Sequence, residues 1–385
     1  MPAIREGEPG VRGKGFSRRQ MARMFGMFAA GAAAVPVFSE AALARISEQE
    51  ITGGQPLPSD VVRIDANENP LGPCKEGLEA IARISPYGGR YSPFDDYATL
   101  TQAVAESEGI DPKYVSLFAG SSDPLFRLTC AFTSPTRSWV MADPGYGGGA
   151  PAHIGSKVVR VPLKADYSHD VAGMLNADPQ AGAYYVCNPN NPSGTTTPLK
   201  DIEHLVANKP KGSIVIVDEA YIHFRENMES ARAMVEAGKD VVILRTFSKV
   251  YGMAGIRSGF AMARPDLLET IGPWADGTLP ITGVACATAS LKAKNVVAER
   301  RKINARIRGD VFEFLEKRNV KYIPSVTNFF MLDVGRPWLE FAKAMSQQKV
   351  LVGRLWPVWP TMVRVSVGTQ EDMSRFKAAF ERVMA

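Results

Sequence analysis

The sequence has few residues of the kinds that build metal centres and disulfide frameworks. Its 385 residues include only four cysteines and four histidines. The cysteines, Cys74, Cys130, Cys187 and Cys286, form no C-x-x-C pair, and the histidines do not form the H-E-x-x-H pattern of a zinc protease. These absences argue against a zinc site and a disulfide framework, and we expect no bound metal.

Long apolar runs and nucleotide-binding loops are lacking too. Beyond residue 44 no run is apolar and long enough to span a bilayer as a helix. The G-x-x-x-x-G-K-[ST] phosphate loop of NTPases is also absent. The net charge is +5, and residues 1–44 carry three of these charges with six basic and three acidic residues. We therefore expect no nucleic-acid partner and no stable membrane anchor.

The first residues have the layout of an export signal. A twin arginine, Arg18-Arg19, is followed by the weakly apolar run 22–38 and then by Ala42-Leu43-Ala44. This order resembles a bacterial Tat signal that is cleaved after Ala44. The alternative is an N-terminal tail or a surface amphipathic helix. The signal predicts export to the periplasm; a chain that did not use it would stay in the cytoplasm.

The remaining residues divide by composition into an arm and two domains. Residues 45–90 are rich in Pro and Gly and are expected to form an N-terminal arm. In residues 91–290 short apolar runs alternate with helical patterns, which favours a large α/β domain with a mostly parallel sheet. Strands are expected at Tyr114–Phe118, Ser138–Ala142, Val158–Val161, Ala183–Cys187, Ser213–Val217 and Val241–Leu244, and helices at Asp95–Glu108, Leu199–Ala207 and Glu229–Ala237.

The pattern of expected helices and strands changes after residue 290. A long charged helix is expected over Asn295–Arg318, and another over Pro337–Gln347. Strands are expected at Val350–Val352 and Met362–Val367. Residues 291–385 are therefore predicted to form a second, small α+β domain.

Two consecutive strands end in residues that can perform chemistry. The first runs into Asp218, and the second runs into Ser248 and Lys249, with Arg257 farther along the chain. In open α/β sheets ligands bind at the carboxyl ends of the strands. An acid there is about as commonly a helix cap, and a single lysine is usually a solvated surface residue. A lysine beside a small hydroxyl residue and an arginine nevertheless suits a carbonyl cofactor that carries a phosphate.

Three loops after other strands support a ligand site at the same edge. Asn188 to Gly194 is a Pro/Asn loop that can aim one Asn side chain at a ligand, and its X-Pro bonds are candidates for the cis form. Gly120-Ser121-Ser122-Asp123 opens a helix, whose first N–H groups can bind phosphate. Tyr146 follows a Pro-Gly turn, where its ring can stack on a flat cofactor. Each loop taken singly is more often an ordinary turn or a half-buried tyrosine.

Together and in this order, these strings resemble the fold-type-I aminotransferases, and within them the histidinol-phosphate aminotransferase branch. The resemblance covers the chain from about Val62 to its end. Its most specific part is R-T-F-S-K-x-Y-G-x-A-G-I-R at Arg245 to Arg257, preceded by V-D-E-A-Y at Val217 to Tyr221. The resemblance implies pyridoxal 5′-phosphate as the cofactor, and the transferase fold with a mostly parallel sheet of seven strands.

The resemblance also implies roles for individual residues. Lys249 is implied to form the Schiff base and to move the proton at the substrate Cα, while Asp218 pairs with the pyridine nitrogen. Tyr221 and Asn191 are implied to hydrogen-bond the cofactor's phenolic oxygen, and Tyr146 stacks on the ring. The phosphate is implied to be bound by Ser122, Asp123, Ser248 and Arg257.

Partners and substrate residues follow from the same resemblance. Tyr91 matches a tyrosine that reaches the phosphate from the partner subunit, which implies a homodimer. Arg364 matches the arginine that binds the substrate's α-carboxylate or an equivalent anion, and Asn67 lies in the segment that closes over the site. Arg354 stands one residue after the position of the family's phosphate-reading arginine, which Gly353 occupies. One residue reverses the side-chain direction in a strand, unless a bulge follows.

The expected reaction is transamination between an amino acid, or an amine like histidinol phosphate, and a 2-oxo acid such as 2-oxoglutarate. Two alternatives stay open at this point. Related folds use the same lysine and aspartate to decarboxylate, eliminate or oxidise amino acids. A non-enzymatic pyridoxal-phosphate-binding protein is the other, although no DNA-binding segment precedes the arm.

Overall fold

The computed structural model describes residues 40–147, 151–152, 154–275 and 277–385, and all of these lie in one compact unit. The twin arginine and the apolar run of the expected signal lie outside the described residues. Among those described, no helix is long and apolar enough to cross a membrane.

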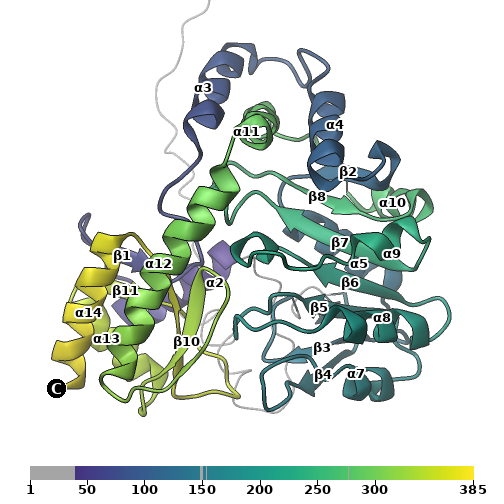
Figure 1. Ribbon diagram of the computed structural model, residues 1–385. Coiled ribbons are helices and arrows are strands. Elements are labelled where there is room, and N and C mark those ends of the chain that lie inside the picture. Colours follow the sequence, from purple (N-terminus) through teal and green to yellow (C-terminus); the bar gives the residue numbers. More distant parts are fainter. Residues whose placement is uncertain (1–39, 148–150, 153, 276) are drawn as a thin grey trace, which may run out of the picture. The chain divides into compact units, whose positions relative to one another are not determined.

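The larger of the described sheets has seven strands in the order β2-β8-β7-β6-β5-β3-β4 (Figure 1). The strands are β2 (Val115–Phe118), β3 (Trp139–Asp143), β4 (Val158–Pro162), β5 (Ala183–Cys187), β6 (Ile214–Asp218), β7 (Val241–Thr246) and β8 (Gly259–Met262). Five of them, β4, β3, β5, β6 and β7, pair in parallel. Every residue of β5, β6 and β7 is buried, as a parallel sheet covered on both faces requires.

Helices and short turns connect these strands. The helices of this part are α3 (Lys75–Ile84), α4 (Asp96–Glu108), α5 (Ser122–Phe132), α7 (Val171–Ala177), α8 (Leu199–Asn208), α9 (Arg232–Glu236), α10 (Pro265–Ile271) and α11 (Ile281–Lys292), with 3-10 turns η1 (Ser85–Tyr87), η2 (Pro112–Tyr114), η3 (Ile222–Phe224) and η4 (Gly272–Trp274). The expected fold class is confirmed by this large, mostly parallel sheet with a smaller C-terminal domain.

The strand β8 was not among the expected strands. It lies antiparallel between β2 and β7. The predicted helix over Glu229–Ala237 was too long, since α9 covers only Arg232–Glu236. The preceding residues instead bind a buried acid: Ser230 Oγ donates to Glu219 Oε2 at 2.8 Å, and the Ala231 amide donates to Glu219 Oε1 at 2.8 Å.

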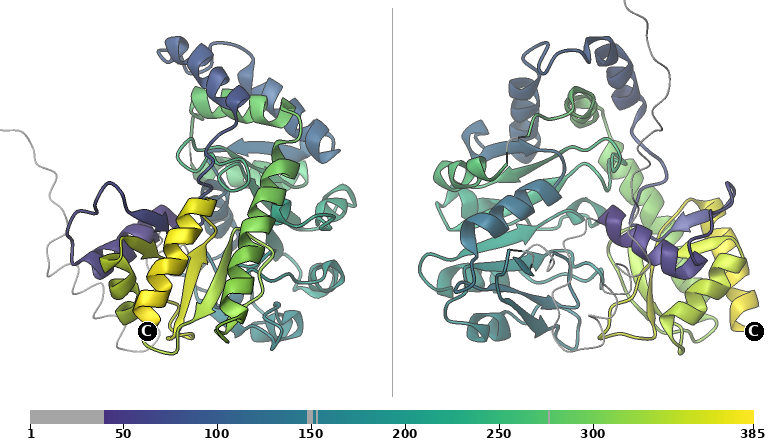
Figure 2. Two further views of the ribbon diagram at one scale, coloured as in Figure 1. Left: turned by 60° about the vertical axis from the view of Figure 1, so that its left-hand side comes forward. Right: turned by 180° about the vertical axis from the view of Figure 1, so that it is seen from behind.

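The C-terminal residues form the smaller domain around a three-stranded antiparallel sheet. Its order is β12-β10-β9, from β9 (Tyr322–Ile323), β10 (Phe329–Asp333) and β12 (Met362–Ser366). The long helix α12 (Val296–Glu316), α13 (Trp338–Gln347) and α14 (Gln370–Met384) pack around it, and α12 contacts α14 (Figure 2). Apolar residues from all three helices and from β10 and β12 share one core.

The residues expected as one arm, 45–90, belong to different parts of the structure. The helix α2 (Glu40–Thr52) contacts α13, and β1 (Val62–Ile64) pairs in parallel with β11 (Val350–Val352) of the smaller domain. The helix α3 packs against α11 instead. The expected boundary after Ala44 falls inside α2. Between β1 and α3, the chain crosses from the smaller domain to the larger one.

Candidate active site

The carboxyl ends of β5, β6 and β7 open into a cavity of about 350 Å³. Eight of the sequence-predicted site residues line it: Ser122, Tyr146, Asn191, Asp218, Tyr221, Ser248, Lys249 and Arg257. They come from strand ends, loops and a helix start that are far apart in sequence, and the parallel register brings them to one edge of the sheet. A cavity of this size is in the range of small-molecule and cofactor sites.

Asp218 is the last residue of β6 and is buried. Its Oδ2 accepts a hydrogen bond of 2.8 Å from the Tyr185 hydroxyl, and its Oδ1 accepts one of 3.1 Å from the Ala220 amide. Burial raises the pKa of this carboxyl to about 6, although the Tyr185 hydrogen bond and Lys249 oppose the shift. A buried carboxylate of this kind is stabilised by a cationic ligand atom.

Tyr185 was not predicted from the sequence. It lies on β5, whose last residue Cys187 is paired with Asp218, and its ring stacks on Trp139 at 5.6 Å. Only the pairing of β5 with β6 brings its hydroxyl to the acid. The available signal was a tyrosine two residues before the end of a strand, and nothing in the sequence shows which strands are neighbours.

Lys249 follows β7 and is 9% exposed. Its Nζ donates to the backbone carbonyl of Asn67 at 3.1 Å and lies 5.5 Å from the centre of the Tyr221 ring. The primary amine therefore lies in the cavity beside both the expected acid and the expected tyrosine.

Ser248 and Arg257 form a cradle for an anion at one end of the cavity. Arg257 Nη1 donates to Ser248 Oγ at 3.4 Å and to Ala254 O at 2.8 Å, while Nη2 donates to Ala119 O at 2.8 Å. The guanidinium passes directly over Gly120, where a side-chain Cβ would collide with it. A glycine at this position is therefore required for the cradle.

The helix α5 begins at Ser122, beside this cradle, and Ser121 and Ser122 both line the cavity. Its first N–H groups are suited to bind an anion. The Asp123 side chain lies elsewhere: its Oδ1 accepts a 2.8 Å hydrogen bond from Arg127 Nε. Asp123 can therefore contribute its backbone N–H, while its carboxylate pairs with Arg127.

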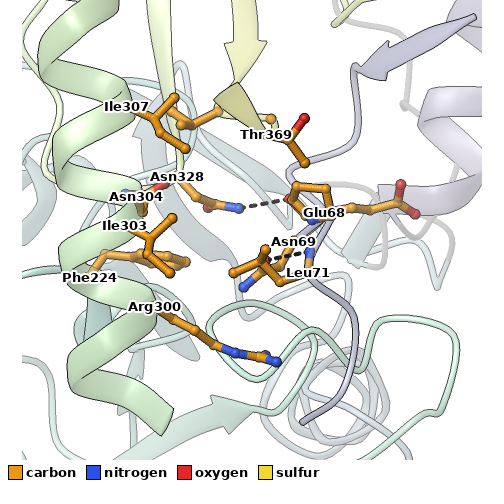
Figure 3. A pocket seen from close by; sticks show the side chains of 13 residues that line it. Glu68, Asn69, Leu71, Phe224, Arg300, Ile303, Asn304, Ile307, Asn328 and Thr369 are labelled. Atoms are coloured by element: carbon orange, nitrogen blue, oxygen red, sulfur yellow. Dashed lines mark hydrogen bonds between the residues drawn. The ribbon is translucent and has the colours of Figure 1, made fainter. Parts of the chain in front are cut away.

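Asn67 lies in the segment between β1 and α3 that crosses from the smaller domain to the larger one, and its hydrogen bonds hold this segment over the cavity. Its Nδ2 donates to the Tyr221 hydroxyl at 3.1 Å, and its backbone amide donates to Ser366 Oγ at 2.8 Å. Asn328 supports the segment from behind, because its Nδ2 donates to the carbonyls of Asn67 at 3.1 Å and Glu68 at 3.2 Å. Figure 3 shows this side chain pointing at the segment from the side of α12.

Arg364 lies on β12 and is 1% exposed. Its Nη1 donates to Asn191 Oδ1 at 2.9 Å, and its Nη2 donates to Asp65 O at 2.8 Å. Asn191 itself lines the cavity, in a loop in which the Asn188–Pro189 and Asn191–Pro192 bonds are both cis. The hydrogen bond places a buried guanidinium of the smaller domain next to the cavity of the larger one.

Arg354 lies near Arg364, although the sequence left the direction of its side chain undetermined. The strand β11 ends at Val352, and the Gly353 amide donates to Arg364 O at 2.9 Å. A Cβ at Gly353 would lie 2.7 Å from Arg364 O, so no side chain fits there. Arg354 Cζ lies 4.7 Å from the centre of the Trp356 ring, and Arg364 Cζ lies 5.2 Å from the same centre. Two buried guanidiniums therefore share one indole, and Trp356 was not among the predicted residues.

Tyr91, like Asp123, is a predicted cofactor residue that is not among those lining the cavity. Its side chain is 83% exposed. Among the described residues, no group of three or more His, Cys, Asp or Glu side chains is arranged to hold a metal ion.

The residues of the cavity fit pyridoxal phosphate by their chemistry. Lys249 offers a primary amine for the aldehyde, and Asp218 offers a buried carboxylate, with a raised pKa, for the pyridine nitrogen. Ser248, Arg257 and the first turn of α5 offer donors for the phosphate. The cavity thus provides a partner for each polar end of this cofactor.

The comparisons with known proteins all identify the same family. The model of the family "Aminotransferase class I and II" matches residues 59–380. The histidinol-phosphate aminotransferase of Moorella thermoacetica is 30% identical over 335 residues, which cover 85% of this chain and 86% of the relative. Histidinol-phosphate aminotransferase 2 of Methylococcus capsulatus is 32% identical over 346 residues, which cover 84% of this chain and 90% of the relative.

Solved structures agree in fold. A putative histidinol-phosphate aminotransferase from Erwinia carotovora atroseptica superposes with a TM-score of 0.80 and 30% identity, covering 85% of this chain and 97% of that one. The histidinol-phosphate aminotransferase of Sinorhizobium meliloti, in complex with pyridoxal-5′-phosphate, has a TM-score of 0.76 and 25% identity, covering 90% of this chain and 95% of that one.

Proposed function

Because this chain belongs to the aminotransferase class I and II family, we propose that its amino donor carries an anionic group which Arg364 and Arg354 bind together. The chain is a pyridoxal-phosphate-dependent transaminase of small molecules. The expectation of transamination is confirmed, and the alternative Cα chemistries and the non-enzymatic function are not favoured.

We propose the following division of work among the site residues. Bound pyridoxal phosphate supplies an aldehyde for the donor amine and a ring that accepts the electron pair left when the Cα–H bond breaks. Lys249 would take the Cα proton and deliver it to the cofactor carbon that bears the donor nitrogen, and Asp218 would keep a proton on the ring nitrogen. Tyr146 would stack on the ring, and Tyr221 and Asn191 would hydrogen-bond its phenolic oxygen. Ser248, Arg257 and the α5 N–H groups hold the phosphate.

The observation that carries the substrate proposal is the pair of buried guanidiniums on Trp356. A carboxylate is satisfied by one bidentate arginine, whereas a phosphate carries more charge and more acceptor oxygens. Two arginines on one indole, of which Arg364 is hydrogen-bonded to the cavity residue Asn191, therefore favour a phosphate-bearing amine, or a donor with a second acidic group. The relatives named above are histidinol-phosphate aminotransferases, so L-histidinol phosphate with 2-oxoglutarate as the acceptor is the first pair to test.

We expect Arg354→Gln to raise KM for L-histidinol phosphate by about 10- to 100-fold, because a charge-assisted hydrogen bond to the anion is lost. KM for L-histidinol, which lacks the phosphate, is expected to stay unchanged. Arg318→Gln is a matched control, since this guanidinium also lies on an aromatic ring, 3.8 Å from the centre of Phe314, but outside the cavity. Steady-state kinetics on both donors provides the measurement.

Equal KM changes for the two donors would contradict the role of Arg354. Absence of turnover with either phosphate-bearing or diacidic donors, together with turnover of a neutral amino acid, would contradict the substrate proposal and leave the transaminase intact.

We also propose that the enzyme is a homodimer in which Tyr91 of one chain reaches the phosphate site of the other. The support is the exposure of Tyr91 together with large apolar side chains near it in sequence, which include Leu78, Tyr87 and Phe94 at 53%, 46% and 54% exposed. Apolar groups gathered at the surface are typical of an interface with another chain.

Sedimentation of the holoenzyme is expected to give twice the mass of the chain. Tyr91→Phe is expected to weaken cofactor binding by about tenfold, because one hydrogen bond to a charged phosphate is removed, without dissociating the dimer. Tyr87→Phe removes a neighbouring hydroxyl and should leave cofactor affinity unchanged. A fully active monomer, or equal effects of the two variants, would refute the proposed contact.

We propose finally that residues 1–44 direct export of the folded enzyme by the Tat route, with the cofactor loaded before transport. The support is the ordered twin arginine, apolar run and A-x-A sequence. Cell fractionation tests this proposal. The wild-type chain should be found in the periplasm without its first residues, and the double variant Arg18→Lys with Arg19→Lys should remain in the cytoplasm. Wild-type chain found only in the cytoplasm at full length would overturn the proposal.

A further inference from the structure

Asn67 is held in a backbone conformation that few residues adopt. Its φ is 54°, in the left-handed region, and its side chain is completely buried. Asparagine adopts this region more readily than most residues other than glycine, and the surroundings enforce the conformation here. Ser366 and Asn328 of the smaller domain provide this enforcement through hydrogen bonds of 2.8 and 3.1 Å to the Asn67 backbone.

The same bonds fix the orientation of the Asn67 amide. Ser366 Oγ donates to Asn67 Oδ1 at 3.3 Å, so the Nδ2 group must face the opposite partner. That partner is the Tyr221 hydroxyl, at 3.1 Å. Since an amide NH₂ can only donate, the Tyr221 oxygen is the acceptor in this bond, and any hydrogen bond that Tyr221 donates is directed to another atom.

We infer that Asn67 is a positioning residue, which polarises the Tyr221 hydroxyl toward the cofactor's phenolic oxygen and holds the Lys249 amine whenever that amine is not bonded to the cofactor. Two separate groups of one residue carry these functions. The side-chain amide acts on Tyr221, and the backbone carbonyl accepts from Lys249 Nζ at 3.1 Å.

The chemical consequence follows from the direction of the amide bond. A hydroxyl that accepts one hydrogen bond becomes a stronger donor in the next, because hydrogen bonds in a chain polarise one another. Tyr221 therefore stabilises negative charge on the cofactor's phenolic oxygen more strongly when Asn67 is present. The phenolic oxygen then attracts less strongly the proton on the adjacent nitrogen, which links the cofactor to Lys249. The pKa of this linking nitrogen is therefore lower.

The Asn67 carbonyl has a complementary role at the other end of the lysine side chain. It accepts from both Lys249 Nζ and Asn328 Nδ2, at 3.1 Å each. A lysine that has left the cofactor is thus held beside the cavity instead of turning toward solvent. Because Asn67 is anchored by the smaller domain, any movement of that domain is transmitted to Tyr221 and Lys249 together.

Other ionisable groups also face this pair and remain unchanged in the variants below. They include Asp218 at the end of β6, Cys187 at the end of β5 and Arg364 on β12, which lies 5.8 Å from the Phe329 ring that packs edge-on against Tyr221. On the segment of Asn67 itself they include Glu68, which lines the cavity, and Asp65, whose pKa burial raises to about 7. A shift observed on changing Asn67 alone is therefore attributable to Asn67.

The test is a spectrophotometric pH titration of the holoenzyme, in which the cofactor's absorbance band reports the protonation of the nitrogen that links it to Lys249. Asn67→Gly removes the amide, keeps the backbone carbonyl and tolerates the positive φ. We expect the pKa of the linking nitrogen to rise by about 0.5–1 unit, as the loss of one hydrogen bond implies. Asn67→Asp should raise the pKa further, because it replaces a donor with a negative charge.

Two controls separate positioning from loss of structure. Asn69→Ala removes a similar bond of the same segment, from Asn69 Nδ2 to Val250 O at 3.0 Å, which does not reach Tyr221; the pKa should stay at the wild-type value. In a Tyr221→Phe background, Asn67→Gly should cause no further shift. An equal shift in Asn69→Ala, an undiminished shift in the Tyr221→Phe background, or no shift in Asn67→Gly would each overturn the inference.

Discussion

Replacing Lys249 with alanine is expected to lower kcat by at least about 10⁴-fold for every amino donor, because the same side chain bonds to the cofactor and moves the Cα proton. No other primary amine is among the residues that line the described cavity. The neighbouring groups are poor substitutes, since Asp218 is bonded to Tyr185 and Tyr221 is bonded to Asn67. Single-turnover kinetics, followed by cofactor absorbance, measures the loss at the proton-transfer step.

The control for this variant is a second buried lysine. Lys209 Nζ donates to Asp240 Oδ2 at 2.8 Å, and its side chain is 6% exposed. Lys209→Ala therefore removes a buried amine at the end of α8 without touching the cavity, and kcat should be unchanged. A Lys249→Ala protein with normal circular dichroism and retained transamination would refute the proposed role of Lys249.

Asp218→Asn is expected to lower kcat by about 10²- to 10³-fold, the usual cost of removing one preorganised electrostatic group from an active site. The variant keeps the shape of the side chain and its contact with Tyr185, but it cannot hold a proton on the ring nitrogen as a carboxylate does. Without this charge the ring accepts the electron pair from Cα less readily. Cofactor content should fall less than kcat, because the phosphate cradle of Ser248 and Arg257 is unaltered.

Asp240→Asn is the matched control for this variant. Asp240 also contacts β6, since its carbonyl accepts from the Val215 amide at 3.0 Å. It lies at the opposite end of the strands, because β7 begins after it and pairs Val241 with Val215 and Leu244 with Asp218. Transamination by Asp218→Asn at the same rate as by Asp240→Asn would show that the ring nitrogen needs no carboxylate.

The sequence predicted the central strands well because their burial dominates their composition. Ala183–Cys187 and Val350–Val352 match the observed strands at both ends, and α8 and α13 differ from their predicted ranges by one residue at one end. The residues of these two strands are all apolar or aromatic and buried, and in the two helices the buried residues recur at helical spacing. The predicted helix over Glu229–Ala237 failed where a distant partner, Glu219, binds the backbone and side chain that would have formed its first turn.

The chemistry of the cavity was predicted for a different reason. Lys249, Asp218 and Arg257 are contained in two short strings, and parallel strands necessarily bring their carboxyl ends to one edge. The sequence could therefore place eight of the predicted residues around one ligand before any contact was known. It could not find Tyr185, whose hydroxyl reaches Asp218 only because β5 lies next to β6.

The sequence by itself determined the fold class through its apolar periodicity, and it determined the cofactor through short strings that resemble one family; it also named eight residues that line one cavity. Tertiary structure alone decided how the two domains meet at the site. Arg354 lies beside Arg364 because β11 ends before Gly353, and Asn67 meets Tyr221 because β12 and Asn328 hold its backbone. The contacts of Asn67 with Tyr221, Asn328 and Ser366 join residues 154, 261 and 299 positions apart, and no local pattern records them.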